Sequence, residues 1–208
     1  MSTLAAVPEA YLAALPAHLL ASPLDFILAD HLRQRVLCSL LDRLATRPRF
    51  EPDLAREVLA HIETDMAIHV IDEEQDLFPL LRRRAVPGDQ LEPVLGQLST
   101  EHAEDSAHAG LIVAGLQAAL DSRQDALDAP LRAGLSRFAA SQRRHLALEN
   151  AVVMPLARQR LSPTDLTALG GRMAARRGIL LTLEAVGPAR QFSRGGGADA
   201  NDDTAFRE

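Results

Sequence analysis

Two stretches of the chain decide its fold: HVIDEEQDLFPLLRRR at residues 69–84 and HLALENAVVMPLARQR at residues 145–160. Each begins with a histidine, places a glutamate four residues later and a proline six residues after that glutamate. At a constant offset of 76 residues, six identities coincide: His69/His145, Glu73/Glu149, Pro79/Pro155, Leu80/Leu156, Arg82/Arg158 and Arg84/Arg160. This agreement in order and spacing indicates an internal duplication.

The segment upstream of each copy repeats as well. Asp30-His31 precedes the first copy and Glu101-His102 precedes the second, at an offset of 71 residues. The chain therefore reads as two helical hairpins, each with one histidine on its first helix and a His-x-x-x-Glu on its second.

Apolar residues recur at helical spacing along most of the chain. This periodicity predicts four long helices at about residues 24–44, 52–84, 90–120 and 130–160. A fifth helix is expected at about 163–186, because Ser162-Pro163-Thr164-Asp165 combines an N-cap serine, a first-turn proline and an acid at the third position. We predict an all-α fold, an antiparallel up-down four-helix bundle with an additional C-terminal helix.

The predicted elements divide the 208 residues into three parts. Residues 1–23 form an irregular, proline-punctuated N-terminal lead, and residues 24–187 form one helical bundle. Residues 188–208 contain a glycine run and acidic residues, which favour a flexible tail.

The amino-acid composition agrees with a helical core and argues against one class of binding partner. Hydrophobic residues make up 47% of the chain and aromatic residues only 3%, so the core must be aliphatic, which favours packed helices over sheets. All 22 basic residues are arginines, and the formal net charge is −6. No nucleic-acid partner is expected from an acidic chain without a basic stripe. The run Arg82–Arg84 is interpreted as a solvated helix end.

A single cysteine, Cys38, excludes an intrachain disulfide and a thiolate zinc site of the Cys₄ or Cys₂His₂ kind. No apolar run approaches the ~18 residues of a membrane span, so no membrane partner is expected. The first 23 residues lack the basic start of a signal peptide, and a cytoplasmic location is the expectation.

The histidines and glutamates carry the predicted chemistry. Residues at i and i+4 lie on one face of a helix, so each His-x-x-x-Glu presents an imidazole beside a carboxylate. Folding the hairpins together would bring six side chains to the middle of the bundle: His31, His69, Glu73, His102, His145 and Glu149. Such a cage is typical of a two-metal site, and its imidazoles and carboxylates fit a redox-active pair such as di-iron or di-manganese.

The duplicated pattern resembles the hemerythrin-like family of HHE cation-binding domains, in particular its bacterial members, over about residues 24–160. The resemblance implies that His31, His69, His102 and His145 are terminal ligands and that Glu73 and Glu149 bridge two non-haem irons. It also implies an oxo or hydroxo group between the metals. Manganese or a mixed-metal pair stays open.

The chain departs from the oxygen-carrying relatives at one position. Those proteins have a second histidine four residues after the first on the third helix, where this chain has Ser106. The difference turns the expectation away from reversible oxygen transport and toward a protein that binds, senses or reacts with a small ligand (dioxygen, nitric oxide or peroxide) or that handles iron. A redox partner is a further candidate on this reading. The alternatives are a di-iron oxidoreductase of peroxidase, nitric-oxide reductase or iron–sulfur repair type and, less favoured, a structural metal-binding module.

The remaining candidates are assigned to packing or to the periphery. His108 and His18 are expected at the surface. His61 is expected too far along its helix to bind the same two metals, and an outer or entrance pair with Asp65 is the alternative for it. Arg35 is a candidate partner of the site one turn after His31. Cys38, Met66, Phe78 and Met154 are interpreted as core residues. Pro79 and Pro155 are expected to bend or end their helices beyond the site.

Overall fold

The computed structural model describes residues 11–181, and within this range every regular element is a helix. Four long rods account for most of it. The first is α1 (Pro23–Thr46), and the second is a continuous run of α2 (Pro52–His61), η2 (Ile62–Met66), α3 (Ala67–Ile71), η3 (Asp72–Leu77) and α4 (Phe78–Arg84). The third is α5 (Leu91–Asp121), and the fourth comprises α6 (Ala129–Leu148), η5 (Glu149–Val153) and α7 (Met154–Arg160). The all-helical prediction is confirmed.

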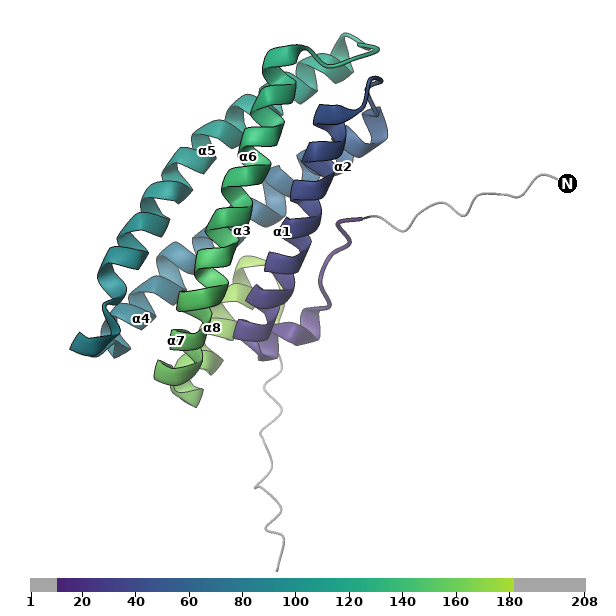
Figure 1. The fold of residues 1–208 in the computed structure, drawn as a ribbon. Helices are drawn as coiled ribbons and strands as arrows, with labels where there is room; N and C mark the ends of the chain where they lie inside the picture. The colour runs from purple at the N-terminus through teal and green to yellow at the C-terminus, as the bar shows by residue number, and fades with distance from the viewer. Residues whose placement is uncertain (1–10, 182–208) are drawn as a thin grey trace, which may run out of the picture.

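The four rods lie side by side, and the colour gradient shows that successive rods run in opposite directions (Figure 1). The most extensive helix–helix contact joins α1 to α6, and α5 also packs along α6. A short 3₁₀ turn, η4 (Pro87–Asp89), connects the second rod to the third. Rods arranged in this way can bring one residue from each to the same level of the fold.

Local sequence explains where the rods begin and end. α1 has Pro23 at its first position and ends at Thr46, after which Arg47 is extended, as expected for a residue before proline. At the start of α6, the Asp128 carboxylate accepts a hydrogen bond from the Leu131 N–H at 2.8 Å.

The additional helix is present but shorter than predicted. α8 (Pro163–Arg176) begins with the expected capping box, in which Ser162 and Asp165 each accept a hydrogen bond from the other's backbone N–H. It ends at Arg176, and Gly178 then adopts a φ of +68°. The predicted end near residue 186 is wrong, because this left-handed glycine turns the chain off the helical path. Residues 182–187 lie outside the described range.

The described part of the N-terminal lead is more ordered than the sequence predicted. It contains a 3₁₀ turn, η1 (Ala17–Ala21), and buries Leu12 and Leu20. η1 packs against α8, where the Gly170 Cα lies so close to the Leu20 carbonyl that a Cβ would collide with it. Residues 1–10 and the predicted flexible tail at residues 188–208 lie outside the described part of the chain.

Two separate apolar clusters form the core. One includes Leu41 and Phe138, and the other includes Leu24 and Leu77. A set of buried polar side chains belongs to neither cluster; it includes His31, His69, Glu73, His102, His145 and Glu149. The fold thus holds a polar site between two aliphatic halves.

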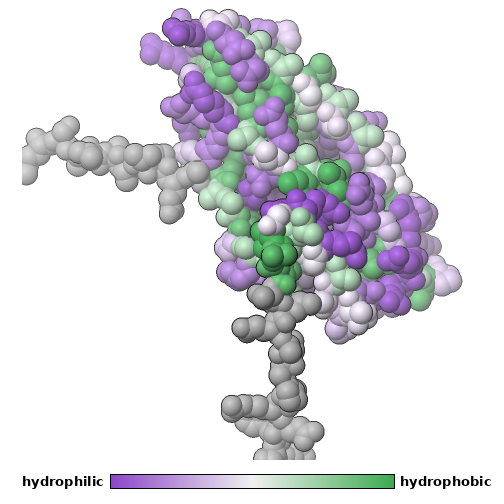
Figure 2. Space-filling model, turned by 180° about the vertical axis from the view of Figure 1, so that it is seen from behind, coloured by the Kyte–Doolittle hydropathy of each residue, from purple (hydrophilic) through white to green (hydrophobic). Residues whose placement is uncertain are grey.

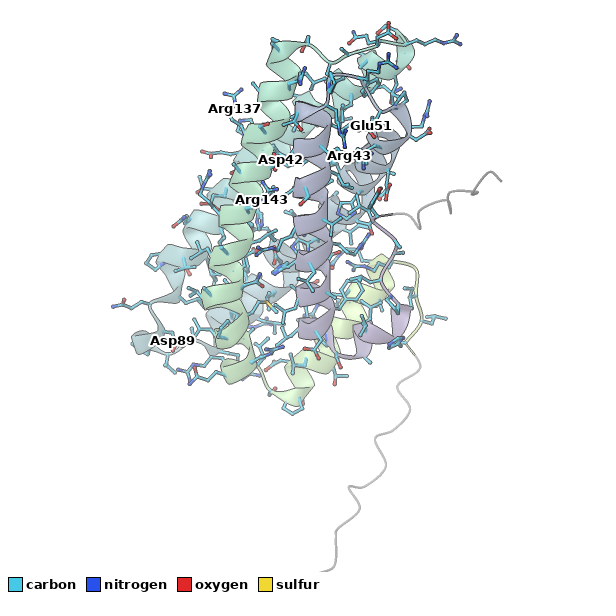
Figure 3. All side chains as sticks on the ribbon, turned by 45° about the vertical axis from the view of Figure 1, so that its right-hand side comes forward. Asp42, Arg43, Glu51, Asp89, Arg137 and Arg143 are labelled. Carbon is cyan, nitrogen blue, oxygen red and sulfur yellow. The ribbon has the colours of Figure 1, made fainter. Side chains whose placement is uncertain are left out.

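The outer faces of the rods are polar, and ion pairs join neighbouring rods. The face seen in Figure 2 is mostly hydrophilic, with smaller hydrophobic patches between. Arg143 of α6 contacts Asp42 of α1, with Nη2 and Oδ2 2.6 Å apart, and Arg43 reaches Glu51 after the turn (Figure 3). Arg82–Arg84 are exposed in the last turn of α4, which confirms their interpretation as a solvated helix end. Among residues 11–181, no helix is long and apolar enough to span a membrane.

Candidate metal centre

The structure brings all six predicted residues together. Each rod contributes one histidine, and the second and fourth rods each add a glutamate one turn further along. The ligand atoms form two groups, each within 4.8 Å: His31, His69, Glu73 and Glu149 in one, and Glu73, His102, His145 and Glu149 in the other. Both glutamates belong to both groups. Glu73 and Glu149 therefore lie within reach of both pairs of histidines.

The four imidazoles turn the same nitrogen toward the glutamates. Nε2 of His69 lies 3.4 Å from Oε2 of Glu73, and Nε2 of His145 lies 3.1 Å from Oε1 of Glu149. Nε2 of His31 is 3.6 Å from Glu73 and 3.4 Å from Glu149. Nε2 of His102 is 3.3 Å from Glu73 and 3.9 Å from Glu149. Six inward-facing side chains thus surround a common centre.

The donor set fits metal ions. Both oxygens of Glu73 and of Glu149 are fully buried and have no hydrogen-bond partner within the described residues, and the same holds for Nε2 of His31 and of His102. Leaving several buried carboxylate oxygens unpaired would be costly in free energy. Cations bound between them would satisfy every one of these atoms. The orphaned atoms therefore support a metal centre at this place.

The opposite nitrogen of each imidazole is held from outside by a second residue. Nδ1 of His69 lies 3.1 Å from Asp30, and Nδ1 of His145 lies 2.8 Å from Glu101. Nδ1 of His102 lies 2.7 Å from Glu74, and Nδ1 of His31 lies 2.8 Å from the Asn150 side-chain oxygen. Such partners fix the ring orientation and leave Nε2 as the nitrogen that can bind a metal.

The four outer partners occupy repeated positions in the two halves of the chain, but each of them contacts a histidine on a different rod. Asp30 and Glu101 each precede a histidine in the sequence, yet each holds the histidine of the next rod. Glu74 and Asn150 each follow a glutamate of the site, and each holds a histidine of the opposite hairpin. Sequence reasoning did not assign these four residues, although their positions repeat at offsets of 71 and 76 residues.

The surrounding charges shift the acid–base properties of the metal-free site. Burial opposes charging of His145, but Glu149 and Glu101 outweigh it and raise its pKa to about 9. At His69, burial also opposes the charged form, but the Glu73 and Asp30 carboxylates outweigh it and raise the pKa of the ring. At Glu73, burial is outweighed by His69 and His102, which lower its pKa. In the metal-free protein, imidazolium charge therefore stabilises the carboxylates that cations would otherwise neutralise.

Wide π-helical turns occur where the glutamates lie. Glu73 is in η3, and Glu149 begins η5. Pro79 and Pro155 occupy the first turn of the α-helices that follow these turns. Proline cannot donate the usual backbone hydrogen bond and its ring crowds the carbonyl four residues earlier, so a widened turn before it relieves the crowding. The prolines therefore end the π turns and not the rods, which continue to Arg84 and Arg160.

A cavity of about 280 Å³ adjoins the site, and His69, His102 and His145 form part of its wall. Ser106, the position of the missing histidine, also lines this cavity but is exposed at its rim. Asp105, which sequence reasoning missed, is buried in the cavity wall, and burial raises its pKa. The side of the centre next to Ser106 is therefore open space rather than packed side chains.

The residues that were predicted to lie away from the metal ligands are either exposed or packed in the core. His18 and His108 are exposed, as expected, and Cys38, Met66, Phe78 and Met154 are buried. Burial raises the pKa of the Cys38 thiol to about 11, as suits a packing residue. Phe78 also stacks on His102, with ring centroids 5.9 Å apart.

Arg33, and not Arg35, is the arginine that reaches the site. Arg35 is exposed, whereas Arg33 is buried and donates to Asp30, the partner of His69, at 2.9 Å. Arg33 Nη2 also lies 3.3 Å from Nδ1 of His61, whose other neighbour is Asp65 at 3.7 Å. His61 thus pairs with Asp65 and lies outside the two ligand groups. The prediction for Arg35 is wrong because that residue points to solvent, two positions further round the helix.

The additional helix α8 holds the π turn that contains Glu73. Arg176 binds the carboxylates of Asp72 and Asp76, with Nη2 2.6 Å from Asp76 Oδ2. Arg177 lies 2.7 Å from Asp72, and Arg172 contacts Asp76. Three arginines of one helical segment therefore neutralise two buried carboxylates that flank the site.

Comparison with known proteins agrees with this geometry. The family model described as the hemerythrin HHE cation-binding domain matches residues 22–157, which covers the first three rods, the fourth rod up to residue 157 and all six site residues. A search of curated proteins found no match. Since the match covers well over half of the chain, the protein belongs to the family of hemerythrin HHE cation-binding domains.

Proposed function

We propose that this protein is a non-haem di-iron protein of the cytoplasm that binds, senses or reacts with small ligands such as dioxygen, nitric oxide or peroxide, or that handles iron. Its scaffold in this proposal is an antiparallel up-down four-helix bundle with an additional C-terminal helix. The observation that carries the proposal is that two four-residue ligand groups share Glu73 and Glu149. A carboxylate has two oxygens and can join two cations, whereas an imidazole binds one.

The donor chemistry supports iron. Each metal would receive two imidazole nitrogens and one oxygen from each glutamate, with no thiolate. This mixture suits iron or manganese, and four protein ligands leave coordination positions open for a small molecule. A bound iron pair supplies Lewis acidity and one-electron exchange at each metal.

The chain's own residues determine access to the pair. On one side of the ligand layer, Ile27, Leu77, Leu98 and Val153 are at most 1% exposed and close the core. On the other side lies the cavity that reaches exposed residues at Ala67 and Ser106. A small ligand would therefore approach from the cavity, while Glu74, Glu101 and Asp30 keep the imidazoles oriented.

Metal analysis combined with absorption spectroscopy tests the proposal. Protein purified without oxygen after iron-replete growth should contain about two irons per chain, and exposure to oxygen should produce oxo-to-iron charge-transfer bands. His145→Ala should lose metal, whereas His108→Ala, which removes an exposed histidine of α5, should keep both ions. Zinc alone, or no metal, would contradict the assignment.

A di-iron oxidoreductase is the second candidate, favoured by the cavity beside the ligands and its buried Asp105. Catalytic turnover of peroxide or nitric oxide, abolished in Glu73→Ala and in Glu149→Ala, would establish an enzyme. Binding of the same ligands without turnover would establish a carrier or sensor. A structural metal module is less favoured, because structural zinc uses four ligands in a closed site and six converge here.

A further inference from the structure

A second layer of side chains lies one helical turn from the ligand histidines. Gln34 follows His31 by three residues, and Asp105 follows His102 by three. Met66 precedes His69 by three residues, and Gln142 precedes His145 by three. Because successive rods run in opposite directions, all four steps lead to the same side of the centre (Figure 1). All four residues line the cavity.

Three of these four residues are polar and deeply buried. Gln34 is 2% exposed, and Asp105 and Gln142 are each 3% exposed. Gln142 donates from Nε2 to Oδ2 of Asp105 at 2.5 Å, which pairs these two side chains across α5 and α6. Nε2 of Gln34 is buried and has no hydrogen-bond partner among the described residues. An amide donor in this condition is destabilising unless something in the cavity accepts from it.

The cavity is large enough to supply that acceptor. Its volume of about 280 Å³ exceeds what one water molecule needs. Ile62, Val70 and Ala109 give it apolar walls, so its polar groups are few and fixed in place. The opposite side of the ligand layer is packed with buried aliphatic residues, and the cavity brings this polar layer next to His69, His102 and His145.

We propose that this cavity is a hydrogen-bonding subsite for hydrogen peroxide, in which the Gln34 amide donates to the bound ligand and the Asp105–Gln142 pair lies opposite. Hydrogen peroxide both donates and accepts hydrogen bonds, so it satisfies the buried amide. Dioxygen and nitric oxide are weak acceptors and would leave that amide unpaired. A site with buried polar groups discriminates against a ligand that cannot pair with them. The inference deepens the proposed function and rests on it for the role of the neighbouring metals.

The subsite itself can be tested without any metal. A crystal structure of the metal-free protein should show ordered water within hydrogen-bond distance of Gln34 Nε2, and the cavity should exclude xenon under pressure. Gln34→Met, which keeps the length of the side chain, should lose that water and admit xenon. Gln117→Met, at an exposed position of α5, is the matched control and should behave as the wild type. A dry wild-type cavity that takes up xenon would overturn the proposal.

The iron-loaded, reduced protein tests the choice of ligand. Each hydrogen peroxide would take one electron from each of two ferrous ions and two protons, its O–O bond would break, and two waters would leave. Gln34→Met should slow this oxidation about tenfold, which corresponds to the loss of one hydrogen bond. The affinity for nitric oxide, which needs no donor, should change less than twofold.

The outcomes separate the two proposals. An equal change for both ligands at unchanged iron content would refute the peroxide subsite, even though the iron centre stands. If the protein binds no iron, the proposed function fails and the assignment to hydrogen peroxide fails with it, while the water and xenon experiment still decides whether the cavity is a hydrogen-bonding site. Should Gln34→Met fold poorly, Gln34→Leu provides a second substitution without a donor.

Discussion

His145 and Glu101 are joined by a contact of 2.8 Å between Nδ1 and Oε2, although Glu101 is the sequence neighbour of His102. The same imidazole directs Nε2 to Glu149 at 3.1 Å. One ring thus bridges an outer carboxylate of α5 and an inner carboxylate of η5. Because the outer carboxylate fixes the tautomer, it decides which nitrogen can bind a metal.

Glu101→Ala should lower metal affinity about 10- to 100-fold, because His145 loses the partner that orients it. Competition against a chelator measures this affinity. Glu104→Ala, an exposed carboxylate on the same helix, provides the matched control and should leave the affinity unchanged. Equal affinities for Glu101→Ala and the wild type would show that the outer carboxylate does not orient the ring.

Metal loading should release protons and become tighter as the pH rises. The pKa of His145 in the metal-free protein is about 9, above its ordinary value of 6.5, so the ring carries a proton at pH 7. A metal can bind Nε2 only after that proton leaves, so the apparent affinity should increase with pH up to about pH 9 and level off above it. Titration in weakly buffered solution measures the protons released. Loading without proton release at pH 7 would contradict the raised pKa.

Arg176→Ala should lower the free energy of unfolding by about 1–3 kcal/mol, because it removes one partner from the buried carboxylates of Asp72 and Asp76. Arg177 and Arg172 remain in contact with these aspartates and limit the loss. Urea unfolding measures the change. Arg56→Ala, which breaks an exposed ion pair with Asp53, should cost less than about 0.5 kcal/mol. Equal effects of the two substitutions would refute a stabilising role for the Arg176 contacts.

The adjacent glycines of α8 should respond in opposite directions to alanine. A Cβ at Gly170 would collide with the Leu20 backbone carbonyl, so Gly170→Ala should destabilise the fold by about 1–3 kcal/mol. Gly171 has open space around its Cα, so Gly171→Ala should stabilise the helix by about 0.5–1 kcal/mol. Thermal unfolding of the two variants provides the comparison. A neutral Gly170→Ala would mean that η1 does not pack tightly on α8.

The inner residues of the site were predictable, but their outer partners were not. The duplicated His-x-x-x-Glu predicts Glu73 and Glu149 as site residues, because residues i and i+4 of one helix share a face. Asp30 and Glu101 were visible as repeated neighbours of a histidine. Which histidine each one holds depends on the packing between rods, and local periodicity carries no information on that packing.

The same distinction applies to the fold. Helical periodicity and the capping sequence at Ser162 predicted the rods and the start of α8. The π turns at η3 and η5 leave no periodic signal, although Pro79 and Pro155 mark their ends in the sequence. The end of α8 was missed because it depends on the backbone angle of Gly178, and a glycine can also continue a helix.

Anomalous diffraction at the iron edge tests the central claim most directly. Crystals of the iron-loaded protein should show two anomalous peaks between the carboxylates of Glu73 and Glu149, about 3.5–4 Å apart. One peak should lie next to Nε2 of His31 and His69, and the other next to Nε2 of His102 and His145. A single peak, or peaks elsewhere in the molecule, would contradict a metal pair bridged by the two glutamates.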